Sequence, residues 1–214
     1  SSAAVSGTIN GVSAGVGILN VNQTFASASD IGGTNALAEV NVAASRTLTM
    51  TGSNSLNATA TTLGSASVLT VNSGTLTSTV DGSATSLGTV NLNGSTLAAG
   101  STLGSTNGLL ALNIGNATSI SAANSIKAAT VTIGGGTSGS LSLAATRTIT
   151  GDVLINDGAT LTLNNGTSVS GTINGVSAGF GILTFNGTNT LANTVGATNR
   201  IALLTVSNAA TLNA

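Results

Sequence analysis

Residues Val5 to Leu19 read VSGTINGVSAGVGIL, and residues Val169 to Leu183 read VSGTINGVSAGFGIL. The two stretches differ at one of 15 positions, and the match continues without a gap to Leu48 and Leu212 with 24 of 44 positions identical. A fixed internal period is typical of an elongated architecture in which each unit contacts only its neighbours. We therefore expect residues 1–214 to form one continuous segment of a longer repeat protein, with related copies at 5–48 and 169–212.

Apolar and polar residues alternate at a period of two over much of the chain. Runs rich in Val, Ile, Leu and Thr predict short β-strands at residues 68–71, 89–92, 110–114, 130–133, 153–155, 160–163 and 182–185. Strong helix formers such as Glu, Lys, Arg and Gln are nearly missing, and 29 glycines interrupt most stretches. The chain is therefore expected to be all-β.

Turn-forming residues follow many of these runs at a recurring interval. They are Gly74, Gly94, Gly115, Gly135, Gly158, Gly187 and Asn208, and the successive steps between them are 20, 21, 20, 23, 29 and 21 positions. The usual step fits one coil of a right-handed parallel β-helix, and the step of 29 would then include an extra loop. The spacing of 164 positions from Val5 to Val169 corresponds to about eight such coils, each adding roughly 4.8 Å to a rod.

Six Asn-Gly pairs leave a second fold open. They begin at Asn10, Asn93, Asn107, Asn165, Asn174 and Asn186. In a β-helix, Asn and Gly supply the left-handed backbone conformations that corners require. The same pair is also the strongest short signal for an antiparallel hairpin. An array of antiparallel β-sandwich repeats is therefore the alternative fold.

Charged residues make up only 4% of the chain, and the net charge is −1. This composition lacks the basic patch that nucleic acids and anionic lipids require. No stretch approaches the continuous apolar run, about 18 residues or longer, of a membrane span. We expect no nucleic-acid partner and no membrane insertion by this segment. Weak repulsion between like rods favours self-association with like subunits or adjacent repeats.

The chain contains neither His nor Cys, which removes Ser-His and Cys-His catalysis and the usual zinc sites. Asp152 and Asp157 form a close acidic pair that could, with Arg147, serve a groove acting on glycosides. The simpler interpretation places these charges on solvated turns. Without Tyr or Trp, sugar stacking would fall to Phe25, Phe180 and Phe185, and we expect Phe185 in the core because Val21 holds the matching position.

Three weaker patterns carry no site. The turn at Gly134 to Gly136 lacks the Asp of calcium-binding repeats. A crosslink from Lys127 to an Asn or Asp beside Glu39 has no local support. Thr-x-Thr pairs, which can order water on a flat face, begin at the irregular positions Thr47, Thr75, Thr130, Thr148, Thr160 and Thr188. We assign no catalytic, cofactor-binding or metal-binding residue, no cofactor and no enzymatic activity.

The phrase VSGTINGVSAGxGIL, preceded by INDGATLTLNNGTSVSG and followed by LTFNGTNTLANTVGA, resembles the passenger regions of bacterial autotransporter adhesins. It is similar above all to rickettsial-type outer-membrane surface antigens, and in style to other β-strand-repeat and surface-layer proteins. The resemblance implies an extracellular stalk, fibre or surface-layer component at the bacterial cell surface. Such a protein supports adhesion or a protective coat, through self-assembly and contact with host or cell-surface glycans. A carbohydrate-binding or carbohydrate-active β-helix is the alternative function.

Overall fold

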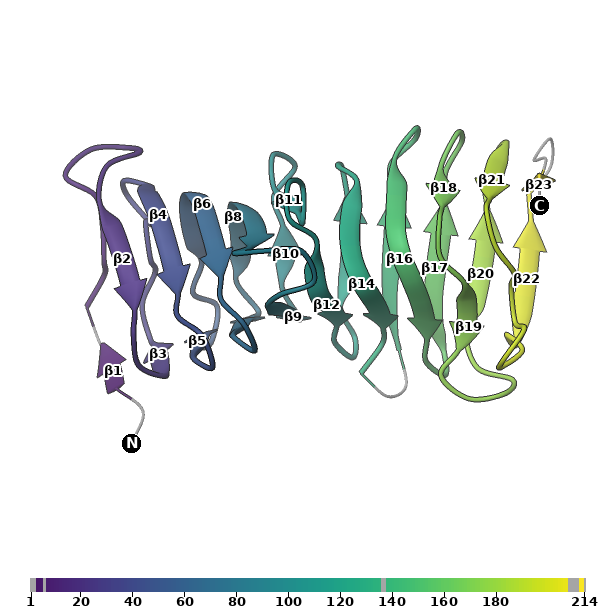
Figure 1. Ribbon diagram of the computed structural model, residues 1–214, viewed down its shortest axis with the longest axis horizontal. Coiled ribbons are helices and arrows are strands. Elements are labelled where there is room, and N and C mark those ends of the chain that lie inside the picture. The colour runs from purple at the N-terminus through teal and green to yellow at the C-terminus, as the bar shows by residue number, and fades with distance from the viewer. Residues whose placement is uncertain (1–2, 6, 136–137, 208–211, 214) are drawn as a thin grey trace.

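The computed structural model describes residues 3–5, 7–135, 138–207 and 212–213, and it is a rod with the first and last described strands at opposite tips (Figure 1). The described residues are all-β and contain no helix. Their strands stack in parallel as a β-solenoid of about nine turns, with coils about 21 residues apart. The predicted parallel β-helix is thereby confirmed, and its right-handed sense stays a prediction.

Each coil has three sides, which the chain visits in the order 1, 2, 3. Side 1 contains β1 (Ala3–Val5), β3 (Phe25–Ser27), β5 (Thr47–Met50), β7 (Val68–Asn72), β9 (Thr89–Asn93), β12 (Leu109–Ile114), β19 (Ile173–Gly175) and the second halves of β14 (Ile126–Ile133) and β16 (Thr148–Ile155).

Side 2 begins with the bridged residues Ile9 and Ile31. It continues with the first halves of β6 (Leu56–Leu63) and β8 (Thr75–Gly82), and then with β10 (Thr96–Leu97), β13 (Ser119–Ala122), β15 (Gly139–Leu143), β17 (Ala159–Leu163), β20 (Ile182–Phe185) and β22 (Leu203–Val206).

Side 3 consists of β2 (Ile18–Val21), β4 (Leu37–Val42), the second halves of β6 and β8, β11 (Thr102–Leu103), the first halves of β14 and β16, β18 (Ser168–Val169), β21 (Asn189–Leu191) and β23 (Leu212–Asn213). Every pairing among the described strands, on all three sides, is parallel. The antiparallel alternative is therefore wrong, because the Asn-Gly pairs turn corners between sides and do not close hairpins.

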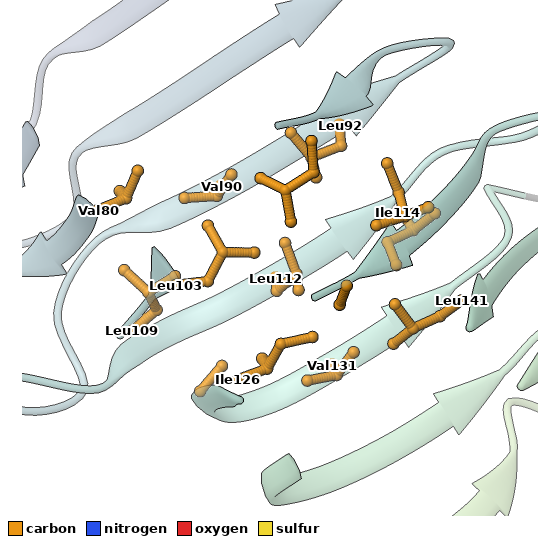
Figure 2. Packing of buried hydrophobic residues seen from close by; sticks show 14 of the residues in the cluster. Val80, Val90, Leu92, Leu103, Leu109, Leu112, Ile114, Ile126, Val131 and Leu141 are labelled. Atoms are coloured by element: carbon orange, nitrogen blue, oxygen red, sulfur yellow. The ribbon is translucent and has the colours of Figure 1, made fainter. Parts of the chain in front are cut away.

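In the strands between β2 and β21, apolar residues point into the rod and stack on their counterparts in the next coil. Figure 2 shows this in the middle of the rod, where Val90, Leu112 and Val131 of side 1 face residues of the other two sides. These three side chains are fully buried. Burying a large aliphatic side chain stabilises the fold by about 1.5–3 kcal/mol. Phe185 is also fully buried, as expected from its match to Val21.

The sequence period is one side short of eight coils. Ile9 lies on side 2, whereas the matching Ile173 lies on side 1. Between Ile9 and Ile173 the chain passes 22 other sides, each represented by one inward residue, so it takes 23 steps from one side to the next. These inward residues are Leu19, Phe25, Ile31, Val40, Leu48, Leu56, Thr61, Leu69, Leu76, Val80, Val90, Leu97, Leu103, Leu112, Ile120, Ile126, Val131, Leu141, Ile149, Val153, Leu161 and Val169.

The step of 29 positions between the turn residues Gly158 and Gly187 also arises because the two residues lie on different edges of the rod. Gly158 turns the chain from side 1 to side 2, whereas Gly187 turns it from side 2 to side 3. The step of 29 positions between them is therefore one coil plus one side. The predicted explanation, an extra loop within a single coil, is wrong. Asn208, the last residue in that series, lies outside the described residues.

Candidate functional surface

Residues Gly11–Gly17 form an exposed loop where the chain turns from side 2 to side 3. Asn10 stands just before it, and its Oδ1 accepts hydrogen bonds from the backbone N–H groups of Thr34 at 3.0 Å and Asn35 at 3.4 Å. The Gly11 N–H donates to the Asn35 carbonyl at 3.2 Å. These bonds fasten the start of the loop to the next coil, and we name it clasp loop A.

Residues Gly175–Gly181, clasp loop C, repeat this arrangement where the chain turns from side 1 to side 2. The Oδ1 of Asn174 accepts from the backbone N–H groups of Thr198 at 3.1 Å and Asn199 at 3.4 Å. The Gly175 N–H donates to the Asn199 carbonyl at 3.0 Å. The two copies of the sequence repeat therefore make the same hydrogen bonds, but on different edges of the rod.

Residues Gly82–Gly88, clasp loop B, form a third copy where the chain turns from side 3 to side 1. Asp81 takes the place of the asparagine, and its Oδ1 accepts from the Thr106 N–H at 3.0 Å. Its other carboxylate oxygen accepts from the Ser105 hydroxyl at 3.2 Å. The Gly82 N–H donates to the Asn107 carbonyl at 3.2 Å, as in the other two loops.

The first residue of each clasp loop has to be glycine because backbone oxygens surround it. A Cβ at Gly82 would lie 2.5 Å from the Ala84 oxygen and 2.7 Å from the Leu87 oxygen. A Cβ at Gly175 would lie 2.6 Å and 2.7 Å from the equivalent oxygens, and Gly11 has the same surroundings. A side chain at these positions would push the loop off the next coil.

Clasp loops A and C expose large apolar side chains, and none of the three loops carries a charge. Val12 at the tip of loop A is 91% exposed, and Val176 at the same place in loop C is 39% exposed. Ile18, the residue after loop A, is 61% exposed. Loop B has Ser83 at the tip. Single exposed apolar side chains are common on protein surfaces, so these residues do not by themselves mark a contact surface.

Several charged residues of the rod join neighbouring coils by hydrogen bonds to the backbone. Asp30 accepts from the Ser55 N–H at 2.7 Å, and Asp152 accepts from the Thr172 N–H at 2.8 Å. These carboxylates hold the corners of the rod in the same way as Asp81 does. Arg147 and Lys127 also bond to a neighbouring coil. Arg147 Nε donates to the Ala123 carbonyl at 2.9 Å, and Lys127 Nζ donates to the Thr106 carbonyl at 3.3 Å.

The structure does not bring the proposed glycoside-acting residues into one groove. Asp152 lines a shallow hollow with Thr172 and Asn174, whereas Arg147 lines a different hollow beside Lys127. Asp157 lines neither of these two hollows and lies in an exposed turn. Phe180 is half-buried in loop C, whereas Phe25 is half-buried against the core and lines a hollow with Ile9 and Leu19 that contains none of the three charged residues.

The weaker sequence patterns are dispersed as well. Thr47 lies on side 1, Thr75 on side 2 and Thr148 on side 3, so the Thr-x-Thr pairs form no single flat array. Glu39 and Lys127 lie on side 3 with three strands between theirs. Gly136 lies outside the described residues, among which no group of three acidic side chains could hold a metal ion.

Sequence reasoning missed loop B because it searched for one long period. The signal was nonetheless present, since an Asn or Asp, a Gly and a second Gly six positions later occur at Asn10, Asp81 and Asn174, and the fourth such pattern, at Asn93, lacks the Thr-Asn pair that follows the other three. In those three cases the Thr-Asn pair comes one coil later, supplies the hydrogen-bonding partners and begins at Thr34, Thr106 and Thr198. Asp81 therefore divides the long period into two unequal parts.

Comparison with known proteins finds a partial match. Over 213 residues the chain is 32% identical to the protein named Outer membrane protein A of Rickettsia rickettsii, and the match covers 95% of this chain and 8% of that protein. The chain therefore corresponds to a small part of that relative. No family model matches the chain, and no solved structure matches it. Within the described residues, no helix is long and apolar enough to cross a bilayer.

Proposed function

We propose that this chain is a segment of an exported structural rod at a bacterial cell surface, which extends the protein outward and packs beside like rods. The observation that carries the proposal is the uninterrupted apolar core, which runs through about nine parallel coils. A body of this form gains length with each repeat without needing a new type of contact. Its function is therefore extension, as a stalk, fibre or surface layer.

The similarity to a protein named for the outer membrane supports the cell-surface location. The low charge supports side-by-side packing, because four basic and five acidic residues in a chain of 214 produce little repulsion between neighbouring rods. Adhesion to a host or to surface glycans would be a property of the whole protein, of which this segment supplies the length. Asp152 and Arg147 line different hollows, which favours the structural role over the carbohydrate-active alternative.

The experiment is electron microscopy of the full-length protein, combined with protease treatment of intact cells that produce it. We expect rods with an axial repeat of about 37 Å, because 23 sides make seven and two-thirds coils that rise roughly 4.8 Å each. We also expect external protease to remove the rod from intact cells. Compact particles without an axial repeat, or a protein that protease reaches only after lysis, would contradict the proposal.

A further inference from the structure

Two of the four basic residues of the chain, Lys127 and Arg147, line one open hollow on side 3. Lys127 lies in β14, and Arg147 directly precedes β16, the strand of the next coil. The hollow has a volume of about 390 Å³, within the range of roughly 300–1,000 Å³ that small-ligand sites occupy. It lies between residues 102 and 150, so described coils flank it on both sides.

The positive charge of this hollow is not neutralised by a neighbouring carboxylate. No acidic side chain lines the hollow, and within the part of the chain that the structure describes neither cation forms an ion pair. Asp81 stands in the same row of side 3, two coils before Lys127. Its carboxylate oxygens already accept from the Ser105 hydroxyl at 3.2 Å and the Thr106 N–H at 3.0 Å.

Each of the two cations is fixed by one hydrogen bond and keeps further donors. Lys127 Nζ donates to the Thr106 carbonyl, and Arg147 Nε donates to the Ala123 carbonyl. An ammonium group has three N–H donors and a guanidinium group has five, so both retain donors for a ligand. Hydrogen bonds from such cations to an oxyanion are among the stronger ones that proteins form. The hollow is therefore suited to a carboxylate or sulfate group.

A row of hydroxyl side chains runs along side 3 and passes through the hollow, where Thr102 and Ser125 belong to its lining. The buried Oγ1 of Thr102 has no hydrogen-bond partner among the described residues, which is uncommon in a folded protein. The register of β8, β11, β14, β16, β18 and β21, which follow one another along the rod (Figure 1), aligns one hydroxyl per coil, roughly 4.8 Å apart. The row consists of Thr79, Thr102, Ser125, Thr148, Ser168 and Thr190, all of them half-buried or exposed.

We propose that the hollow of Lys127 and Arg147 binds a carboxylate or sulfate group of an acidic polysaccharide that lies along side 3. The two cations hold the anionic group, and the hydroxyl row bonds to the sugar hydroxyl groups directly or through water. A nucleic acid fits less well, because its affinity comes from the neutralisation of many phosphates and the hollow supplies two cations. The site adds a ligand to the structural role and does not depend on side-by-side packing of the rods.

The test compares two double variants that remove the same charge. The site variant carries Lys127→Gln and Arg147→Gln, and the control carries Arg46→Gln and Arg200→Gln at the two remaining basic residues, which are exposed and lie outside the hollow. Surface plasmon resonance measures binding to immobilised heparin, which carries sulfate, to polygalacturonate, which carries carboxylate, and to neutral dextran. Circular dichroism checks that each variant folds.

We expect the wild type and the control to bind at least one of the two acidic polymers and not dextran. The site variant should bind about tenfold more weakly, because two partly exposed charge contacts are lost. The variant Thr150→Asp keeps both cations and places a carboxylate in the lining of the hollow, so it should weaken binding as well. The polymer that the wild type prefers identifies sulfate or carboxylate as the bound group.

Three results would overturn the proposal. One is equal weakening in the site variant and the control, which would show that net charge alone attracts the polymer. Another is a wild type that binds neither acidic polymer, or that binds dextran as well as it binds them. The third is competition by inorganic sulfate at the same concentration of anionic groups as the polymer, which would indicate a site for a free anion. The rod function stands in all three cases, because electron microscopy tests it separately.

Discussion

Clasp loops A and C differ at one of seven residues, Val16 against Phe180, and they carry the same hydrogen bonds on different edges of the rod. The local sequence therefore specifies the shape of the corner and its attachment to the next coil. The direction in which the corner points depends on the 23 sides between the loops. Shape and direction are thus encoded at separate places in the chain.

Loop B shows how little sequence the corner needs. It shares only its first and last glycine with loop A, yet the loop start and its acceptor residue make equivalent bonds. The requirements are an Asn or Asp oxygen just before the loop, a glycine among the carbonyl oxygens, and a second glycine at the end. Gly17 and Gly88 fill that last position with φ of 97° and 73°, a region that favours glycine.

The largest expected effect comes from breaking the core that holds loops A and C 23 sides apart. Leu112→Ala removes a fully buried side chain from the row on side 1 and should lower the free energy of unfolding by about 2–5 kcal/mol. Leu110→Ala, two positions away and 46% exposed, should cost less than about 1 kcal/mol. Urea denaturation measures both variants. Similar losses for the two would mean that the core row does not carry the stability.

The next effect distinguishes the loop glycines from ordinary ones. Gly82→Ala places a methyl group against the Ala84 and Leu87 oxygens and should cost about 1–3 kcal/mol. Gly100→Ala is the matched control, because a Cβ there meets no atom within 4 Å and the φ is not positive. Thermal melts followed by circular dichroism compare the two. A Gly82→Ala protein as stable as the control would argue against the clasp geometry.

A smaller effect follows from removing one clasp acceptor. Asn174→Ala leaves the N–H groups of Thr198 and Asn199 without their Oδ1 partner and should cost about 1–2 kcal/mol. Hydrogen exchange at these two amides should accelerate, while amides in the core of β16 keep their protection. If exchange is unchanged at Thr198 and Asn199, the bonds assigned to Asn174 are not formed in solution.

The smallest effect tests whether the three loops are equivalent. Asp81→Asn gives loop B the amide acceptor that loops A and C use. Both side chains offer an Oδ1 to the Thr106 N–H, and the Ser105 hydroxyl can accept from the new amide, so the change should alter the stability by less than about 0.5 kcal/mol. Urea denaturation of the variant beside the wild type measures the difference. A loss above about 1 kcal/mol would show that an amide does not replace the carboxylate here.

Sequence periodicity was sufficient to predict the solenoid because inward positions such as Leu69, Val90 and Leu112 recur near the coil length, and a parallel stack buries them all at once. The corners were predicted to need Asn and Gly, which Asn10 and Gly11 confirm. The number of sides in one sequence repeat could not be predicted in the same way. Sides differ in length, so spacing along the sequence alone cannot separate 23 sides from 24.

The role of the charged residues was also out of reach of the sequence. Asp152 was predicted to be a solvated turn charge, but it accepts a hydrogen bond from the Thr172 N–H of the next coil. Asp81, for which no role was predicted, accepts one from the Thr106 N–H. Which N–H meets which carboxylate depends on how the coils align, and that alignment is set by the whole stack. These two acidic residues are therefore part of the fold, with Asp81 performing the task of Asn10 and Asn174.

The central claim, that successive clasp loops lie on different edges, is tested most directly by distances between spin labels on introduced cysteines. One label pair is at residues 13 and 83, which lie ten sides apart, and the other is at residues 13 and 99, which lie twelve sides apart on one edge. Along the axis these pairs are separated by roughly 16 Å and roughly 19 Å. We expect the distance between residues 13 and 83 to be the longer one, because it also crosses a side of the rod. A shorter distance for that pair would place loops A and B on one edge and contradict the claim.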